Sequence, residues 1–157
     1  KGGRGVYPKP IAFNVLPQCD DFGEEGYTKE EMKLVNETRK ILNEPALAIS
    51  ATAARVPVRI GHSEAVLVEF ERPLDVADVR AALAAAPGVC LLDGREPGAY
   101  PTALDVDGRD EVWVGRIRRD LSSERGIWLW IVADNLRKGA ATNAVQIAEH
   151  LFFGVPR

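Results

Sequence analysis

The stretch between Glu64 and Leu92 limits the possible folds most, because strand-like and helix-like periodicities alternate along it. Glu64–Phe70 places Val66, Val68 and Phe70 against polar neighbours, which predicts a strand with one buried face. A helix is predicted from about Asp75 to a stop at Gly88, and Val89–Leu92 returns to a strand. This alternation within one short stretch predicts an α+β unit.

A hairpin is predicted further along the chain. Val112–Arg118 and Ile127–Val132 have strand character, and a polar connection containing Gly126 joins them. Trp128 and Trp130 fall on one face of the second strand, so this face needs a cover. The cover is either a helix that completes a core layer or a second subunit.

Four more elements flank this pattern. The apolar run Ile11–Leu16 predicts a buried strand that Pro17 closes, and Leu47–Ala53 predicts another strand. Thr28 and Glu31 have the spacing of a capping box, which predicts a helix that begins after Thr28. A further helix, rich in small residues, is expected after Gly139, and its small side chains favour close packing.

Composition excludes several classes of protein. The 157 residues carry a net charge of -3 with both signs mixed, which argues against a nucleic-acid or membrane-surface partner, and Arg116, Arg118 and Arg119 read as a solvated strand end. The two cysteines, Cys19 and Cys90, lie far apart without metal-ligand spacing, so we expect a reducing, cytoplasmic location. The glycine-rich start lacks an initiator Met and a signal peptide, which suggests a piece of a longer polypeptide.

Arg55 and His62 are the first candidate site residues. Pro57 and Gly61 between them allow the chain to bend, so both side chains can reach one pocket. A guanidinium matches a carboxylate, and an imidazole transfers protons near neutral pH. The alternative is that Arg55 caps an exposed strand end and His62 is a surface histidine.

Glu30 and Lys33 form a second candidate pair. They are three residues apart on the predicted helix and are left free because Glu31 serves the cap. They can bind a zwitterion or an anion, or form a solvated salt bridge. His62 and Glu64 match half of a zinc-deaminase motif, but the P-C-x-x-C half is missing, so we expect no metal. No nucleotide-binding glycine fingerprint occurs either.

Several longer blocks carry a family resemblance that extends in order over nearly the whole chain. Together they resemble the aspartate-β-semialdehyde dehydrogenase family. The blocks are Asn14–Gln18, Thr28–Lys33, Glu37–Ile41, Ser50–Thr52, Arg55–Val58, Gly61–Glu64, Asp134–Ala141 and Gln146–Glu149.

The resemblance implies a mixed sheet with helices on one face, as in the C-terminal domain of glyceraldehyde-3-phosphate dehydrogenase. Residues 1–157 would be a substrate-binding and dimerisation domain whose N-terminal Rossmann, NADP-binding domain is absent. The family reduces L-aspartyl-4-phosphate with NADPH to L-aspartate-4-semialdehyde and phosphate, in diaminopimelate and lysine, threonine and methionine biosynthesis. A homodimer is expected.

The resemblance also implies residue roles. His62 would be the acid/base catalyst, Arg55 would hold the substrate α-carboxylate and Glu30 its α-amino group, Lys33 would bind phosphate, and Asn135 would lie against NADP. The family's nucleophilic cysteine belongs to a segment upstream of Lys1, and neither Cys19 nor Cys90 matches its motif, so this chain alone is expected to be inactive. The family pattern Thr-Cys-Val-Arg reads Thr52-Ala53-Ala54-Arg55 here. The alternative function is a non-catalytic dimerisation or small-ligand-binding module.

Overall fold

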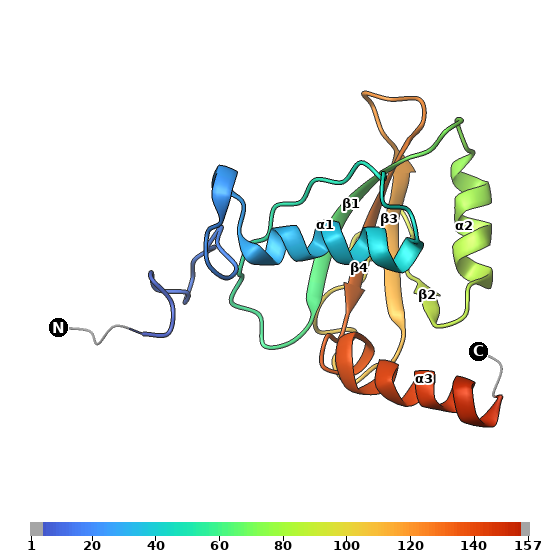
Figure 1. Ribbon diagram of the computed structural model, residues 1–157. Coiled ribbons are helices and arrows are strands. Elements are labelled where there is room, and N and C mark those ends of the chain that lie inside the picture. Colours follow the sequence, from blue (N-terminus) through green and yellow to red (C-terminus); the bar gives the residue numbers. More distant parts are fainter. Residues whose placement is uncertain (1–4, 155–157) are drawn as a thin grey trace. The chain divides into compact units, whose positions relative to one another are not determined.

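The computed structural model describes residues 5–154 (Figure 1). The chain divides into two compact units, residues 1–57 and residues 58–157. The first unit is mostly irregular, with a short 3-10 turn, Glu24–Gly26, and one long helix, α1, Lys29–Leu42. The second unit contains the sheet and the remaining helices.

Helix α1 begins at the predicted capping box. The Thr28 hydroxyl accepts the Glu31 backbone N–H at 3.3 Å, and the Glu31 carboxylate accepts the Thr28 N–H at 2.8 Å. These bonds satisfy backbone donors that the first helical turn cannot satisfy itself. The helix ends at Asn43, which adopts the left-handed conformation. The predicted helix and its cap are confirmed.

The two strands predicted in the first unit are wrong. Within Ile11–Leu16 the backbone of Phe13 takes a φ of 57°, which interrupts any extended run, and only Leu16 pairs, in an isolated bridge with Arg55. Leu47–Ala53 also lies outside any strand, and the Ala53 N–H bonds to the Glu31 carboxylate at 2.8 Å. An apolar run forms a strand only if a partner strand makes hydrogen bonds to its backbone. Here turns and the Glu31 side chain supply backbone hydrogen bonds instead.

The second unit is built on a mixed four-stranded sheet of order β1-β4-β3-β2 (Figure 1). β1 and β3 both pair with β4 in antiparallel fashion, and β2 pairs with β3 in parallel. The predicted strands, hairpin and α+β class are therefore confirmed. The strands are β1 His62–Glu69, β2 Val89–Leu91, β3 Val112–Arg119 and β4 Gly126–Ala133.

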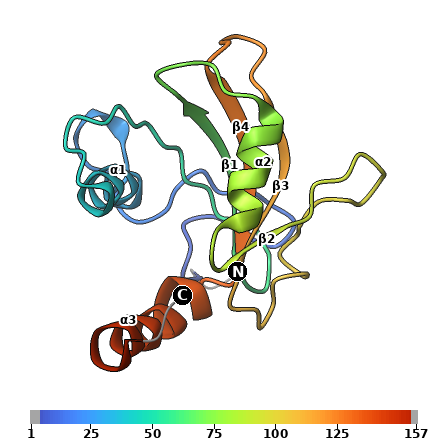
Figure 2. The same ribbon diagram turned by 90° about the vertical axis from the view of Figure 1, so that its right-hand side faces the viewer.

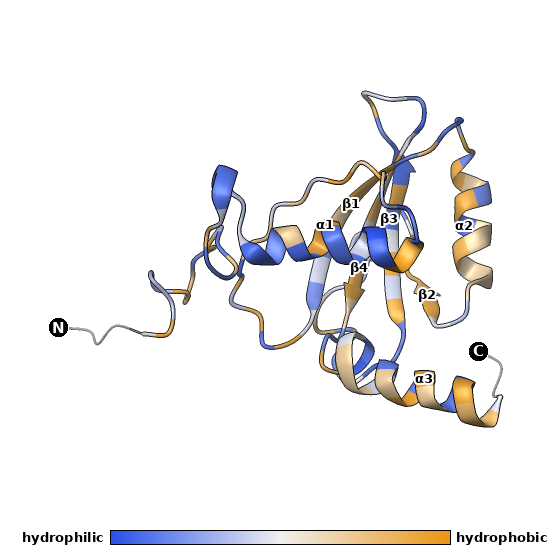
Figure 3. Ribbon diagram, viewed as in Figure 1, coloured by the Kyte–Doolittle hydropathy of each residue, from blue (hydrophilic) through white to orange (hydrophobic). Residues whose placement is uncertain are grey.

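Helix α2, Val76–Ala85, packs along one face of this sheet (Figure 2). Its N-cap is Asp75, whose carboxylate accepts the Ala77 N–H at 2.9 Å. Val79 and Leu83 pack against the buried cluster of Val114, Ile117 and Ile127. The apolar colouring of the central strands follows this core (Figure 3).

The opposite face carries the two tryptophans, as predicted from their spacing. A loop contributes to their cover: the Trp130 indole N–H donates to the Pro101 carbonyl at 2.9 Å, and Pro101 and Val106 of the same loop are fully buried. The Trp128 indole N–H donates to Asp120 at 3.2 Å. A loop therefore covers part of this face and satisfies the Trp130 indole N–H. The cover by a helix or by a second subunit stays a prediction for the rest of the face.

The chain leaves the sheet through a five-residue π-helical turn, Arg137–Ala141, and continues as α3, Thr142–Phe153. The predicted helix after Gly139 is confirmed. None of its residues is buried, so the expected close packing is not seen, and Leu151, Phe152 and Phe153 are exposed. The residues of the predicted basic strand end, Arg116, Arg118 and Arg119, are exposed.

No helix within residues 5–154 has both the length and the apolar character needed to cross a membrane.

Thr28→Ala should lower the free energy of unfolding by about 1 kcal/mol, because it removes a cap from the first turn of α1. Urea denaturation followed by far-UV circular dichroism measures this loss. Thr28→Ser keeps the hydroxyl and should retain most of the stability. Equal stability of the wild type and the Ala variant would contradict the role of the cap.

Gly115→Ala should destabilise the second unit by about 1–3 kcal/mol through overpacking. A Cβ at this position would lie 2.2 Å from the Leu92 carbonyl oxygen, so the backbone of two neighbouring segments must shift. Gly139→Ala is the matched control, since its nearest neighbour would be at 3.7 Å. Thermal unfolding of both variants measures the difference, and equal melting temperatures would refute the tight contact.

Candidate functional site

The predicted site residues fall in both units. Glu30, Lys33 and Arg55 belong to the first unit, and His62 and Asn135 belong to the second. The common pocket predicted for Arg55 and His62 remains a prediction, because these side chains belong to different units.

Glu30 and Lys33 lie on the first turns of α1, where the cap fixes the helix. The Lys33 ammonium lies 3.4 Å from both carboxylate oxygens of Glu30, and both side chains are about half exposed. This is the solvated pair that their spacing predicted, and such a pair is weak enough to exchange partners with a ligand. Glu31 is not available in this way, because the Thr28 and Ala53 N–H groups hold its carboxylate and lower its pKa.

Arg55 has a fixed backbone and an exposed side chain. Its N–H and carbonyl both bond to Leu16, at 2.8 and 3.0 Å. Its guanidinium lies over the ring of Tyr7, 5.5 Å from the centroid, and forms no salt bridge with a carboxylate in the described residues. A stacked guanidinium keeps its N–H groups at the edge available, so Arg55 can accept a carboxylate ligand.

Cys19 lies near these charged groups. Burial raises the pKa of its thiol; the Arg55 guanidinium opposes that shift, whereas the Glu30 and Glu31 carboxylates add to it. A nucleophilic cysteine needs a lowered pKa, because the thiolate is the reactive form. The environment of Cys19 therefore does not activate its thiol. That Cys19 is not the nucleophile stays a prediction.

His62 is the first residue of β1 and pairs with Ala133 at the end of β4. Its side chain is exposed and has no hydrogen-bond partner within residues 5–154. The preceding residue, Gly61, has a φ of +91°, and a Cβ there would lie 3.2 Å from the Ala133 carbonyl oxygen. The bend that the sequence permitted at Gly61 is therefore present, and it requires glycine.

Asn135 lies in the turn that follows β4. Its Oδ1 accepts the Gly61 N–H at 3.1 Å, so its side chain is directly connected to the residue before His62. The adjacent Asp134 is buried, and its carboxylate accepts the Gly108 N–H at 3.0 Å and the Leu136 N–H at 2.9 Å. Burial acts to raise the pKa of Asp134, but these backbone N–H groups outweigh it and leave the pKa below its usual range.

A salt bridge fixes the next turn of the chain. The Arg137 guanidinium donates to both oxygens of Asp110, at 2.7 and 2.9 Å, and the Thr142 hydroxyl donates to Asp110 at 2.7 Å. These bonds lower the pKa of Asp110 to about 2. Neither this pair nor the Tyr7 stack gives a local sequence signal, because the partners lie 27 or more positions apart in the chain.

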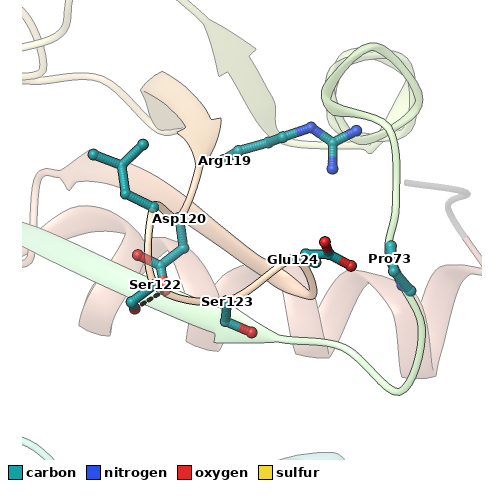
Figure 4. A pocket seen from close by; sticks show the side chains of 7 residues that line it. Pro73, Arg119, Asp120, Ser122, Ser123 and Glu124 are labelled. Atoms are coloured by element: carbon teal, nitrogen blue, oxygen red, sulfur yellow. Dashed lines mark hydrogen bonds between the residues drawn. The ribbon is translucent and has the colours of Figure 1, made fainter.

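A hollow beside the β3–β4 hairpin contains none of the predicted site residues (Figure 4). Asp120 and Glu124 face it together with Arg119, and the Ser122 hydroxyl donates to Asp120 at 2.6 Å. Two carboxylates against one guanidinium disfavour an anionic ligand. In residues 5–154 no three His, Cys, Asp or Glu side chains gather in a way that could hold a metal ion.

Comparison with known proteins gives the family. Residues 2–138 match the family described as semialdehyde dehydrogenase, dimerisation domain. The aspartate-semialdehyde dehydrogenase of Legionella pneumophila is 58% identical over 147 residues, which is 93% of this chain and 42% of that protein. The Bacillus subtilis enzyme is 51% identical over 96% of the chain and 43% of its own length. The chain thus spans less than half the length of these relatives.

Solved structures agree. The crystal structure of aspartate semialdehyde dehydrogenase II from Vibrio cholerae matches with a TM-score of 0.91 at 50% identity, over 96% of this chain and 44% of that one. The enzyme from Candida albicans, solved with NADP, matches with a TM-score of 0.73 at 30% identity, over 94% and 46%. These neighbours confirm the predicted glyceraldehyde-3-phosphate-dehydrogenase-like fold. The chain belongs to the aspartate-semialdehyde dehydrogenase family and corresponds to its C-terminal dimerisation domain.

Proposed function

We propose that this chain supplies the substrate-binding and proton-transfer groups of an NADP-dependent aspartate-semialdehyde dehydrogenase. The reaction is the reduction of L-aspartyl-4-phosphate to L-aspartate-4-semialdehyde with release of phosphate, in the cytoplasmic synthesis of lysine, threonine and methionine. The observation that carries the proposal is the high identity to enzymes of this name over 93% of the chain. A second Vibrio cholerae structure, of the enzyme complexed with ASA, matches with a TM-score of 0.90.

The first unit binds the amino-acid end of the substrate in this proposal. Arg55 holds the α-carboxylate through its guanidinium fork, which no protein carboxylate occupies in the described residues. Glu30 accepts the α-ammonium group, and Lys33 binds the phosphate. The weak 3.4 Å contact between Glu30 and Lys33 supports these roles, because little interaction is lost when each turns to a ligand.

The second unit provides the proton. His62 lies at the exposed start of β1 and has no hydrogen-bond partner within residues 5–154, so its imidazole is free to give and take a proton at the reacting carbonyl oxygen. The nucleophilic cysteine and the glycines that bind the cofactor belong, in this proposal, to the part of the enzyme that the chain does not span.

The chain itself offers NADP one contact group, Asn135. Its Oδ1 is committed to Gly61, but its Nδ2 has no partner within residues 5–154 and can donate to an acceptor on the cofactor. When bound, NADPH supplies the hydride for the reduction. The match to a dimerisation domain further supports a homodimer as the working assembly.

His62→Ala, made in the complete polypeptide that carries this chain, should lower kcat by about 10²–10⁴-fold because it removes the proton-transfer group. KM for the substrate should change little. His150→Ala is the matched control, because His150 lies exposed in α3 and should keep normal kinetics. Normal turnover by His62→Ala would remove this assignment, and a wild type without dehydrogenase activity would favour a dimerisation or ligand-binding module.

Arg55→Lys should raise KM for the substrate about 10–100-fold, because an ammonium cannot replace the bidentate fork. Steady-state kinetics with varied substrate measure this change. Arg59→Lys is a suitable control in the same segment, since Arg59 is exposed and has no assigned role. An unchanged KM for Arg55→Lys would show that the α-carboxylate is bound elsewhere.

A further inference from the structure

We propose that Asn135 is a positioning residue for His62 and acts through the backbone of Gly61. The inference rests on the proposed role of His62 in proton transfer. It assigns to the side-chain oxygen of Asn135 a task separate from any contact that this residue makes with the cofactor.

The key contact joins two segments that are 74 residues apart. Asn135 Oδ1 accepts the Gly61 N–H at 3.1 Å. Gly61 directly precedes His62, and His62 pairs with Ala133, the last residue of β4. The start of β1 is therefore attached at two consecutive points, by the strand ladder at His62 and by the Asn135 side chain at Gly61.

Gly61 is the position where such attachment matters. Its φ of +91° is open to glycine but strained for other residues, and glycine without a partner samples many conformations. The N–H that Asn135 holds belongs to the peptide plane that rotates about this angle. This bond holds the peptide plane before Gly61, and the pairing of His62 with Ala133 holds the backbone after it, so together they limit the conformations of Gly61 and the position of the His62 backbone that carries the imidazole.

The turn that carries Asn135 is itself fixed by hydrogen bonds and a salt bridge. The buried Asp134 carboxylate accepts the Gly108 and Leu136 N–H groups, at 3.0 and 2.9 Å, and fixes the turn that carries Asn135. The Arg137–Asp110 salt bridge fixes the turn on the other side. A rigid support of this kind lets one hydrogen bond set the geometry of a catalytic group.

The amide of Asn135 allows its two roles to be separated by substitution. Asn135→Ala removes both the acceptor for Gly61 and the Nδ2 donor. Asn135→Asp keeps an acceptor of the same shape for the Gly61 N–H but has no donor. A positioning role depends on the acceptor, whereas a contact with an acceptor on the cofactor depends on the donor.

The test is a double-mutant cycle in the complete polypeptide. At saturating NADPH we expect Asn135→Ala to lower kcat about tenfold with an unchanged KM for the substrate. Asn135→Asp should restore most of kcat under the same condition, while its KM for NADPH stays raised because the Nδ2 donor is lost. In the His62→Ala background, Asn135→Ala should cause no further loss, because a residue that acts through His62 has nothing left to position. Losses that multiply, or an Asn135→Asp variant as slow as Asn135→Ala, would overturn the proposal.

Amide hydrogen exchange in the 157-residue chain provides a readout that needs no activity. The Gly61 amide should exchange faster in Asn135→Ala than in the wild type or in Asn135→Asp, whereas amides inside β3 should not change. Equal protection of Gly61 in all three proteins would overturn the inference. A wild type without dehydrogenase activity refutes the proposed function instead, so the two failures are distinct.

Discussion

The backbone pairing of β4 places the segments of the second unit that carry the candidate residues His62 and Asn135. β4 lies between β1 and β3, so its hydrogen bonds set the register of both neighbours. That register puts His62 opposite Ala133 and brings Gly61 to the turn where Asp134 and Asn135 follow β4. A shift of one residue would turn every side chain of β1 to the opposite face and would move His62 away from this turn.

Polar groups stabilise this end of the sheet. The buried Asp134 carboxylate is stabilised by the backbone N–H groups that donate to it, and Asp110 is held by Arg137 and Thr142. The pKa of Asp110 falls from 3.8 to about 2 in the folded chain. Its contribution to stability is therefore complete above its unfolded pKa, near 3.8, and is lost as the pH falls towards 2. The Asp110 carboxylate, which holds Arg137 next to the Asn135 turn, therefore stays charged at neutral pH.

The first unit shows the limits of local patterns. The capping box at Thr28 and Glu31 was predictable because all its atoms belong to one helical turn. The apolar runs Ile11–Leu16 and Leu47–Ala53 predicted strands that the structure does not contain. Apolar content indicates burial or extension, but a strand also needs a partner for its backbone, and the partner is a long-range feature.

The sequence by itself determined the helices, the alternating strands of the second unit, the family and the candidate residues, because these depend on local periodicity and on blocks of neighbouring residues. Glu30 and Lys33 formed their predicted pair for the same reason. Only the tertiary structure decided that Asn135 bonds to Gly61, that Tyr7 lies against Arg55 and that Glu31 also bonds to Ala53. These contacts join residues far apart in the chain, so they depend on strand register and chain reversal, which local propensity does not encode.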